Sequence, residues 1–226
     1  MYKEKKYYWR KGDFHSNEGY IKEENIKNGI TQTNTGKEFF ISDADFSDNI
    51  EKIKRGPQAI MRKDIGSIIA NTGIGKDSVV LEAGAGSGKL TASLANICKK
   101  VYSYEKKGDV LKIAKGNIEF LGFKNVSFKN EDVKNINETS IDVIILDLSN
   151  PWDYIKECHN ALKSGGHLVI YVPTITQVNE FVQENKLFHV TEVLELLKRP
   201  WFVEGKKVRP NSRMIGHTAF LIFCRK

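Results

Sequence analysis

A glycine-rich segment is the feature of this 226-residue sequence that points most directly to chemistry. Residues 81–88 read LEAGAGSG, directly after a predicted strand and directly before a predicted helix. Glycines permit a tight turn there, and they let a ligand approach backbone that carries no Cβ atoms. The spacing is G-x-G-x-G with an acid two residues ahead, whereas a dinucleotide-binding loop reads G-x-G-x-x-G. The segment predicts a ligand-binding loop of a different kind, with a bare turn as the alternative.

Three carboxylates are predicted to lie at the same edge of the sheet as this loop. Glu105 ends the second predicted strand, Asp132 follows the third, and Asp147 closes the apolar fourth strand. Ligands bind at the carboxyl ends of the strands in open α/β sheets, where a carboxylate such as Glu105 can accept from both ribose hydroxyls of a nucleoside. Asp132 and Asp147 also have structural alternatives, because aspartate commonly caps the helix that follows it.

Alternating strands and helices must position these residues. From residue 57 onward the pattern predicts a parallel sheet covered by helices on both faces. Gly165 and Gly166 are predicted to end the fourth helix. The predicted strands are 78–82, 101–105, 126–128, 141–146 and 168–172, and the predicted helices are 57–71, 89–98, 109–121, 152–162 and 176–186. Two β-rich stretches, 190–197 and 217–224, are predicted to pair antiparallel at one edge of the sheet.

Residues 1–55 are predicted to form a small β domain that precedes the α/β domain of residues 56–226. Three short β-like stretches, 19–22, 29–32 and 38–41, occur in this part of the chain. Turn-forming residues lie between them.

Composition excludes several classes of protein. The chain is 40% hydrophobic and 28% charged, and it has no apolar run of the ~18 residues that a membrane-spanning helix needs. We predict no secretory signal, because no apolar stretch follows the charges of Met1–Arg10. Three widely spaced cysteines argue against a disulfide framework, and the histidines lack metal-ligand spacing. A reducing cytoplasm fits this composition best.

The positive charge of the chain is concentrated at its C-terminal end. Residues 198–226 hold 8 Lys or Arg against 1 Glu, whereas the rest of the chain is nearly neutral. The residues at the centre of this excess are Lys198, Arg199, Lys206, Lys207, Arg209 and Arg213. Such a cluster predicts a polyanionic partner, because cations displace condensed counterions from phosphates. A solvated basic tail is the alternative.

With these features the sequence resembles the tRNA (adenine-N1)-methyltransferase family that acts on the T-loop, in its archaeal and bacterial, TrmI-like form. The glycine-rich segment resembles the first motif of class I S-adenosylmethionine (SAM)-dependent methyltransferases. Four other segments carry the resemblance: KRGPQAIMRKD at 54–64, LDLSNPW at 146–152, YVPTITQ at 171–177 and RPNSRMIGHTAF at 209–220. The tyrosine that the family usually has in the first of these segments is replaced here, where residues 58–62 read QAIMR.

The resemblance implies an α/β, Rossmann-like class I SAM-dependent methyltransferase fold, with a mostly parallel seven-stranded sheet and a small N-terminal β domain. It implies methyl transfer from SAM to N1 of adenosine 58 in the tRNA T-loop, and adenosine 57 stays open as a further target. It also implies a homotetramer that binds tRNA. The composition and residue spacing described above predict a cytoplasmic protein with no membrane segment and no metal.

Carried over by position, the resemblance implies roles for individual residues. Asp147 is the predicted catalytic residue, which orients the target adenosine. Glu105 takes the ribose of the cofactor, and Asp132 with Val133 takes its adenine. The full set of predicted cofactor-binding residues is Gln58, Ile60, Gly84, Ala85, Gly86, Ser87, Gly88, Glu105, Asp132, Val133 and Asp147.

Two other functions stay open at this point. The first is methylation of protein isoaspartyl groups or of small molecules, because isoaspartate methyltransferases share the glycine-rich loop; they are not expected to carry the segment 209–220. The second is a non-catalytic RNA-binding subunit of the same fold. The intact loop, together with Glu105 and Asp147, disfavours that second alternative.

Overall fold

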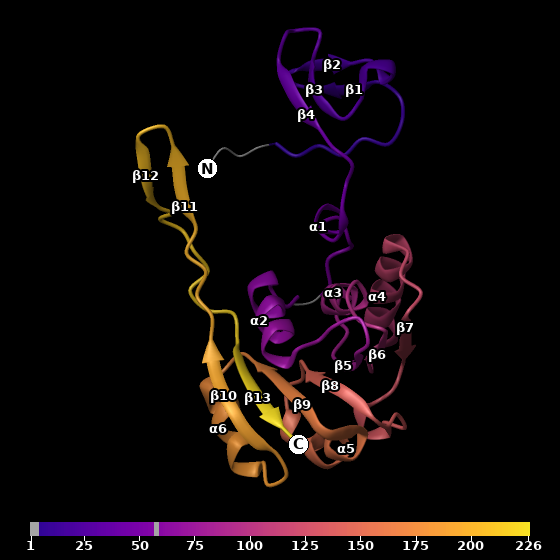
Figure 1. Cartoon of the computed structure of the whole chain (residues 1–226), viewed down its shortest axis with the longest axis vertical. Helices are drawn as coiled ribbons and strands as arrows, with labels where there is room; N and C mark the ends of the chain where they lie inside the picture. The colour runs from indigo at the N-terminus through magenta and orange to yellow at the C-terminus, as the bar shows by residue number, and fades with distance from the viewer. Residues whose placement is uncertain (1–4, 57–58) are drawn as a thin grey trace. The chain divides into compact units, whose positions relative to one another are not determined.

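The computed structural model describes residues 5–56 and 59–226, and the chain divides into two compact units (Figure 1). One unit is Met1–Asn49 with Trp201–Pro210, and the other is Ile50–Pro200 with Asn211–Lys226. The domain boundary predicted after residue 55 lies slightly beyond Asn49 and stays a prediction. Within the described residues, no helix has both the length and the apolar character needed to cross a membrane.

A seven-stranded sheet in the order β10-β13-β9-β8-β5-β6-β7 forms the centre of the larger unit. Its strands are β5 (Val79–Ala83), β6 (Lys100–Tyr104), β7 (Val126–Lys129), β8 (Ile141–Leu146), β9 (Leu162–Val172), β10 (His189–Glu195) and β13 (Phe220–Arg225). The first five of these pair in parallel, and β13 runs antiparallel to both β9 and β10. The predicted mostly parallel α/β fold is therefore confirmed, including the antiparallel pair at its edge.

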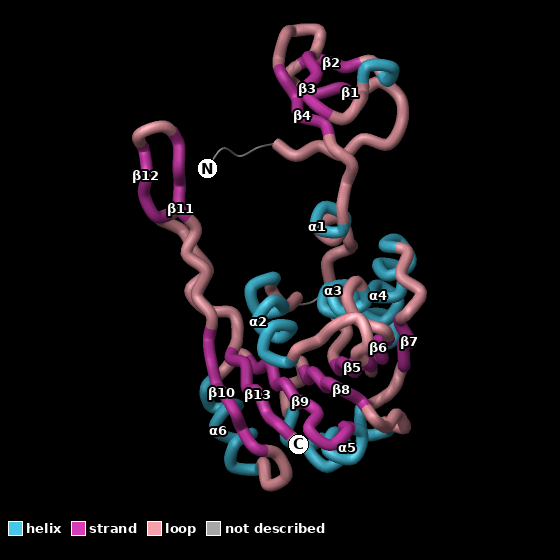
Figure 2. The backbone as a smooth tube through the Cα atoms, viewed as in Figure 1, coloured by secondary structure: helices cyan, strands magenta, loops and turns pink. Residues whose placement is uncertain are grey.

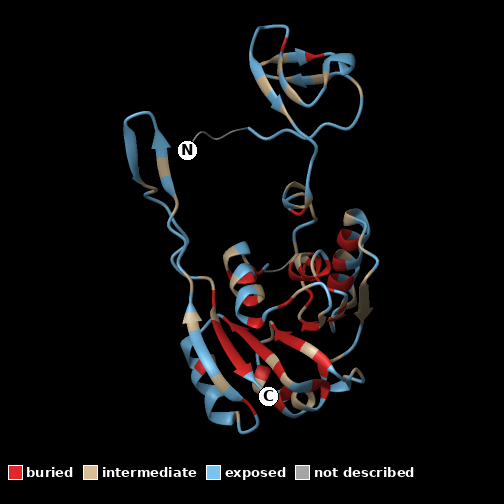
Figure 3. Cartoon of the chain, viewed as in Figure 1, coloured by how far each residue is buried: buried red, intermediate tan, exposed pale blue. Residues whose placement is uncertain are grey.

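Helices cover both faces of this sheet (Figures 1 and 2). On one face α2 (Arg62–Thr72) and α3 (Lys89–Ala95) bury apolar side chains against the strands, and α4 (Gly108–Leu121) packs against α3 and β7. On the other face α5 (Ile155–Ala161) and α6 (Ile175–Glu184) do the same. Because both faces are covered, the central strands are almost continuously apolar and buried (Figure 3).

Two predicted helix boundaries are wrong. The helix predicted from residue 57 begins at Arg62, because Met61 is extended (φ −78°, ψ 152°) and caps it; Pro57, the predicted first residue, lies outside the described residues. The helix predicted over 152–162 is a 3-10 turn, Pro151–Tyr154, followed by α5.

Gly165 and Gly166 do not end that helix, as the sequence suggested, but lie within β9. The pairing of β8 with β9 is irregular between Ile141 and Val143, so β9 bulges there. Gly165 has a φ of +71°, and a Cβ on Gly166 would lie 3.0 Å from the carbonyl oxygen of Lys163. These glycines therefore serve a β-bulge.

The N-terminal residues form two short antiparallel hairpins. β1 (Phe14–Ser16) pairs with β2 (Gly19–Ile21), and β3 (Gly29–Gln32) pairs with β4 (Glu38–Ile41). The 3-10 turn Glu23–Asn25 separates the hairpins, and a short helix, α1 (Phe46–Asn49), follows them. The rings of Tyr7, Phe14 and Phe39 contact one another at centroid distances of 5.2–5.9 Å. The three predicted β-like stretches correspond to β2, β3 and β4.

A third hairpin, β11 (Trp201–Glu204) with β12 (Lys207–Pro210), has no counterpart among the predicted elements. Its register places an apolar set on one face, namely Trp201, Val203, Val208 and Pro210. The opposite face carries Phe202, Glu204, Lys207 and Arg209. Within the described chain Trp201, Val203 and Val208 are 58%, 64% and 58% exposed, and Figure 3 shows the hairpin as largely exposed.

Candidate functional site

The site lies where the strand order of the sheet reverses. From β5 the chain proceeds to β6 and β7 in one direction, whereas β8 and β9 lie on the other side of β5. Ligands of open α/β sheets bind at this switch point, outside the carboxyl ends of the strands. Here the carboxyl ends of β5 and β8 are held together, because the N–H of Asp147 donates to the carbonyl oxygen of Ala83 at 2.9 Å. The glycine-rich loop and Asp147 therefore meet.

The loop needs its glycines at two positions in particular. Gly84 has a φ of +94°, and a Cβ there would overlap the carbonyl oxygen of Asp147. Gly88 has a φ of +77°, and a Cβ there would lie 3.2 Å from the Cα atom of Ala114 in α4. Any other residue would push the loop away from β8 or α3 away from α4. The local sequence thus holds the loop tight against both neighbours.

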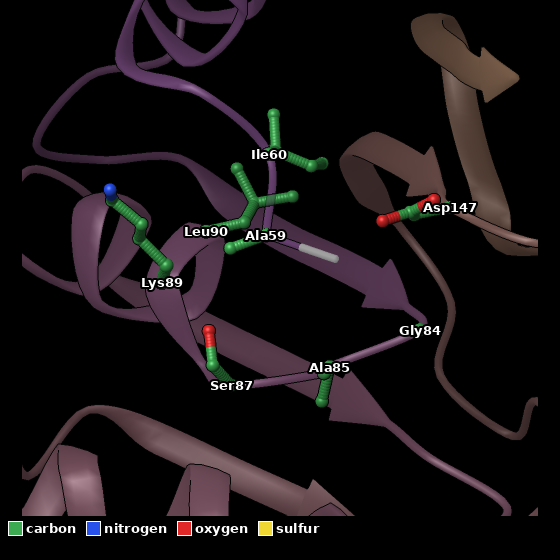
Figure 4. Close-up of a pocket in the computed structure, with 9 residues that line it drawn as sticks. Ala59, Ile60, Gly84, Ala85, Ser87, Lys89, Leu90 and Asp147 are labelled. Atoms are coloured by element: carbon green, nitrogen blue, oxygen red, sulfur yellow. The ribbon is translucent and has the colours of Figure 1, made fainter. Parts of the chain in front are cut away.

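One pocket joins the loop, Asp147 and the segment before α2 (Figure 4). Its lining residues are Ala59, Ile60, Gly84, Ala85, Gly86, Ser87, Lys89, Leu90 and Asp147. Ile60 and the loop were predicted from the sequence, and the structure brings them together with Asp147. Gly88 lies between the lining residues Ser87 and Lys89 and is the N-cap of α3. Gln58, another predicted residue, lies outside the described residues.

Glu82 is a buried carboxylate directly beneath this loop. Its Oε1 accepts from the hydroxyls of Thr91 and Ser103, the latter at 2.7 Å. Among the described residues its Oε2 is buried with no hydrogen-bond partner. Burial above all, with the charges of Asp147 and Glu105 adding to it, raises the pKa of Glu82 to about 7. Glu82 was not among the predicted site residues, although its place two residues before the first loop glycine was a usable signal.

Asp147 and Glu105 both lie near the loop, close enough for the charge of Glu105 to act on Asp147. The N–H of Gly86 donates to Glu105 Oε2 at 3.4 Å, and the N–H of Lys107 donates to Oε1 at 3.0 Å. Burial first, and the charge of Glu105 second, raise the pKa of Asp147 to about 7. No hydrogen bond from residues 5–56 or 59–226 reaches the Asp147 carboxylate. Asp147 is therefore a desolvated group whose carboxylate accepts no hydrogen bond from the described part of the chain.

Asp132 has the opposite electrostatic surroundings. Its Oδ1 accepts from the N–H of Lys134 at 2.9 Å, which is the capping role considered from the sequence, and Lys106 pairs with its Oδ2 at 2.6 Å. Burial opposes ionisation, but these two donors outweigh it and hold the pKa of Asp132 below its usual range. Lys106 also donates to the hydroxyl of Tyr154 at 3.2 Å. Val133, beside Asp132, is buried. Lys106 had no sequence signal beyond its position after Glu105.

Comparison with solved structures defines the class of this site. A SAM-dependent O-methyltransferase of Thermotoga maritima is 31% identical and superposes with a TM-score of 0.83, covering 95% of this chain and 84% of its own. The tRNA (m1A58) methyltransferase TrmI of Aquifex aeolicus is 27% identical with a TM-score of 0.83, covering 96% and 90%. The fold and the glycine-rich loop are those of a class I SAM-dependent methyltransferase.

The family follows from the sequence comparisons. The family model described as the tRNA methyltransferase complex GCD14 subunit matches residues 51–209. The tRNA (adenine(57)-N(1)/adenine(58)-N(1))-methyltransferase TrmI of Methanocaldococcus jannaschii is 32% identical over 92% of this chain and 86% of its own. This chain belongs to that tRNA methyltransferase family. The predicted family, fold class and cofactor are thereby confirmed.

The pocket suits the cofactor of this family on physical grounds. SAM carries a sulfonium and an ammonium, and the carboxylates of Glu82, Glu105 and Asp147 surround the loop. The buried Oε2 of Glu82 lacks a donor among the described residues, and an ammonium or a water bound to it would satisfy that need. Backbone without a Cβ atom at Gly86, which lines the pocket, permits close approach of a ligand. No cluster of residues typical of a metal site occurs among the described residues.

Asp147→Asn is expected to stabilise the cofactor-free protein more at pH 8 than at pH 5. The raised pKa means that the folded protein holds this proton more tightly than the unfolded chain, so ionisation lowers stability as the pH rises from about 4 through about 7. Asparagine removes that cost. Thermal melts should show a rise in melting temperature at both pH values that is several degrees larger at pH 8 than at pH 5, at about 2–4 °C per kcal/mol.

Asp142, at the other end of β8, provides the matched control. Burial opposes its ionisation, but Lys163 and the N–H of Val79 outweigh this and lower its pKa. Asp142→Asn should therefore reduce the melting temperature at pH 8. A melting temperature of Asp147→Asn at pH 8 that equals or falls below wild type would contradict the electrostatic account.

Proposed function

We propose that this chain transfers a methyl group from SAM to N1 of adenosine 58 in the tRNA T-loop, with Asp147 as the catalytic residue. The observation that carries the proposal is the Asp147 carboxylate, which lines the cofactor pocket with a raised pKa. Such a group is ready to accept a hydrogen bond from the substrate. The tRNA methyltransferases that match most of this chain support the substrate class.

The other predicted residues take cofactor-binding roles in this proposal. Glu105, at the end of β6, accepts from the ribose hydroxyls, and Asp132 accepts from the adenine amino group beside buried Val133. Residues Ala85 to Gly88 hold the methionine part, and Ile60 contacts the cofactor from the segment before α2. Gln58, which lies outside the described residues, keeps its predicted cofactor-binding role. When bound, the sulfonium supplies an activated methyl group. The lowered pKa of Asp132 supports its role, because an ionised carboxylate is the better acceptor.

Adenine N1 already has a lone pair, so it needs orientation more than deprotonation. Asp147 accepts a hydrogen bond from the exocyclic amine, which pushes electron density toward N1 and stabilises the positive charge that develops on the ring. Holding N1 in line with the methyl group provides much of the remaining acceleration. These roles require an ionised Asp147, and the positive charge of the bound cofactor favours that state.

The target base must leave the folded T-loop before it reacts, because N1 takes part in tertiary pairing there. Enzymes that act on a base move it out of the stack into a pocket. Trp152, in the turn after Asp147, and Pro173, after β9, are proposed to form the apolar wall for the everted adenine.

Asp147→Ala is expected to lower kcat for methylation of an unmodified tRNA transcript by about 10²–10³-fold, the effect typical of removing one preorganised electrostatic contact. Cofactor affinity should change far less, because the loop, Glu82 and Glu105 remain. Labelled SAM with tRNA gives the rate, and calorimetry gives the affinity. Wild-type kcat in this variant would remove Asp147 from the catalytic role.

The same assay separates the alternative functions. Digestion of the product and identification of the modified nucleoside should give 1-methyladenosine at position 58, and it reveals whether position 57 is also methylated. Label in an isoaspartyl peptide but not in tRNA would favour the protein methyltransferase. Cofactor binding without transfer to any of these acceptors would favour a non-catalytic subunit.

The β11–β12 hairpin and its flanks are proposed to contact the tRNA backbone. Lys206 and Lys207 are exposed at its tip, and Arg209 lies over the ring of Phe202 with 5.5 Å between the guanidinium carbon and the centroid. Lys198, Arg199 and Arg213 flank the hairpin. A cluster of cations binds a phosphate backbone more strongly than a single solvated cation does, because it releases more counterions.

Replacing Lys206 and Lys207 together with alanine should weaken tRNA binding and reduce its salt dependence. The slope of log K against log salt is expected to fall by about 1.5, at about 0.7–0.9 per phosphate contact. Filter binding between 50 and 200 mM salt measures this slope. Lys112→Ala with Lys115→Ala, on the exposed side of α4, removes the same charge elsewhere and should leave the slope unchanged. Equal slopes for both double variants would place the RNA contacts elsewhere.

We propose further that the chain works as a cytoplasmic homotetramer, with the apolar face of the β11–β12 hairpin in an interface between copies. An isolated two-stranded hairpin is marginally stable in water, and this face exposes Trp201, Val203 and Val208. The charged face of the hairpin suits RNA, so the apolar face is left for protein. The three cysteines are buried and unpaired, which suits a reducing compartment.

Val203→Glu with Val208→Glu should break the tetramer into smaller species in sedimentation velocity. These residues form a cross-strand pair, so both charges would be buried in the proposed interface. Glu204→Gln with Lys207→Gln, a cross-strand pair on the other face, should keep the wild-type mass. A monomeric wild type would refute the tetramer, and a tetramer that survives the glutamates would exclude this face from the interface.

A further inference from the structure

The C-terminal segment before β13 folds against the first turn of α2 through a polar network centred on the buried Asp64. The hydroxyl of Thr218 donates to Asp64 Oδ2 at 3.0 Å. The ammonium of Lys63 donates to the Thr218 hydroxyl at 2.6 Å and to Asp64 Oδ1 at 2.7 Å. Tyr171, from β9, donates its hydroxyl to the same Asp64 oxygen at 3.4 Å. Asp64 is fully buried, so every one of its partners matters energetically.

The neighbouring residue fastens the same segment to the ends of two strands. The Nε2 atom of His217 donates to the carbonyl oxygen of Pro173, just after β9, at 2.7 Å. Its Nδ1 contacts the carboxylate of Glu195 at the end of β10. Hydrogen bonding to Glu195 first, and to Pro173 second, raises the pKa of His217. His217 and Thr218 together therefore connect β9, β10 and α2 at one point.

Asp64 acts on a wall of the cofactor pocket because of its place in the helix. Its N–H and that of Ile65 donate to the carbonyl oxygen of Met61 at 2.9 and 3.0 Å, so the first turn of α2 is built directly on Met61. The preceding residues, Ala59 and Ile60, line the pocket opposite the glycine-rich loop. Displacement of Asp64 would move this turn, and Ala59 and Ile60 with it.

We propose that Thr218 is a positioning residue for cofactor binding, whose hydroxyl acts through Asp64 and Lys63 to keep Ala59 and Ile60 closed over the pocket. The inference rests on the proposed function for the identity of the cofactor, but not on the identity of the methyl acceptor. Thr218 is not one of the pocket-lining residues, so it works at a distance from the ligand. Without its hydroxyl, Asp64 loses a donor and the Lys63 ammonium loses an acceptor in a buried site.

Thr218→Val tests the proposal, because valine keeps the shape of the side chain and removes its hydrogen bonds. The dissociation constant for SAM, measured by calorimetry without RNA, should rise about five- to tenfold, which is only part of the effect of losing a hydrogen bond to a charged group, because Thr218 acts on the pocket indirectly. With saturating SAM and tRNA, kcat should stay within about twofold of wild type. Thr218→Ser retains the hydroxyl and should restore most of the affinity. Thr218→Ala, which also lacks the hydroxyl, replaces the valine variant if that variant does not fold.

Thr72→Val is the matched control for general destabilisation. Thr72 is buried, whereas Thr218 is half-buried, and the Thr72 hydroxyl donates to the carbonyl oxygen of Ile68 at 2.6 Å at the other end of the same helix. This variant should lower the melting temperature and leave the SAM dissociation constant within about twofold of wild type. An equal loss of affinity in Thr72→Val would overturn the proposal, because any damage to α2 would then suffice.

A double-mutant cycle tests whether Thr218 acts through Asp64. Asp64→Asn should weaken SAM binding, and adding Thr218→Val to it should change the affinity by less than about twofold. Fully multiplicative effects would overturn the route through Asp64. Wild-type protein that does not bind SAM would refute the proposed function itself, whereas SAM binding equal in wild type and Thr218→Val would refute this inference alone.

Discussion

Three carboxylates lie close together where the strand order reverses, namely those of Glu82, Glu105 and Asp147. The site depends on their mutual electrostatic repulsion, which is strong because their surroundings are desolvated. Burial first, and then this repulsion, raise the pKa of both Glu82 and Asp147 to about 7. The carboxylates cannot move apart, because the pairing of β5 with β8 and the close contact at Gly84 fix the backbone around them. A bound cation relieves the repulsion. The same repulsion therefore lowers the folding stability of the cofactor-free protein and attracts the sulfonium. Such a trade-off between stability and function is common.

The antiparallel strand β13 explains how the far end of the chain reaches this site. It inserts between β9 and β10, so the residues just before it emerge beside the end of β9 and the first turn of α2. His217 and Thr218 use that position to connect three elements that are remote in sequence. A parallel sheet alone supplies the loop and the carboxylates at its edge, but the wall formed by Ala59 and Ile60 belongs to a segment outside the sheet. The C-terminal segment provides the connection that the sheet does not.

Much of the site could be predicted from the sequence because it sits at strand ends. Apolar runs located the strands, and the residue that follows each run, such as Glu105 or Asp147, had to lie at the ligand-binding edge. The partners of these residues could not be predicted in the same way. Nothing in the pattern distinguishes Lys106, which pairs with Asp132, from a solvated lysine, and Asp64 meets Thr218 across 154 positions.

The bulge at Gly165 and Gly166 looked like a helix end because glycine serves both purposes. The β11–β12 hairpin was missed because its strands are four residues each and charges interrupt its alternation.

The two aspartates of this edge illustrate how surroundings divide labour between identical side chains. Asp132 is paired with Lys106 and with the N–H of Lys134, so it stays ionised and fixed in place, as a residue that holds an adenine amino group needs to be. Asp147 faces another carboxylate, and among the described residues no donor binds it, so its charge is costly until a ligand arrives. A carboxylate that is already paired with a cation gains little more when positive charge develops nearby, whereas an unpaired one gains most. The surroundings lower the pKa of Asp132 and raise that of Asp147. This difference supports a binding role for Asp132 and a catalytic role for Asp147.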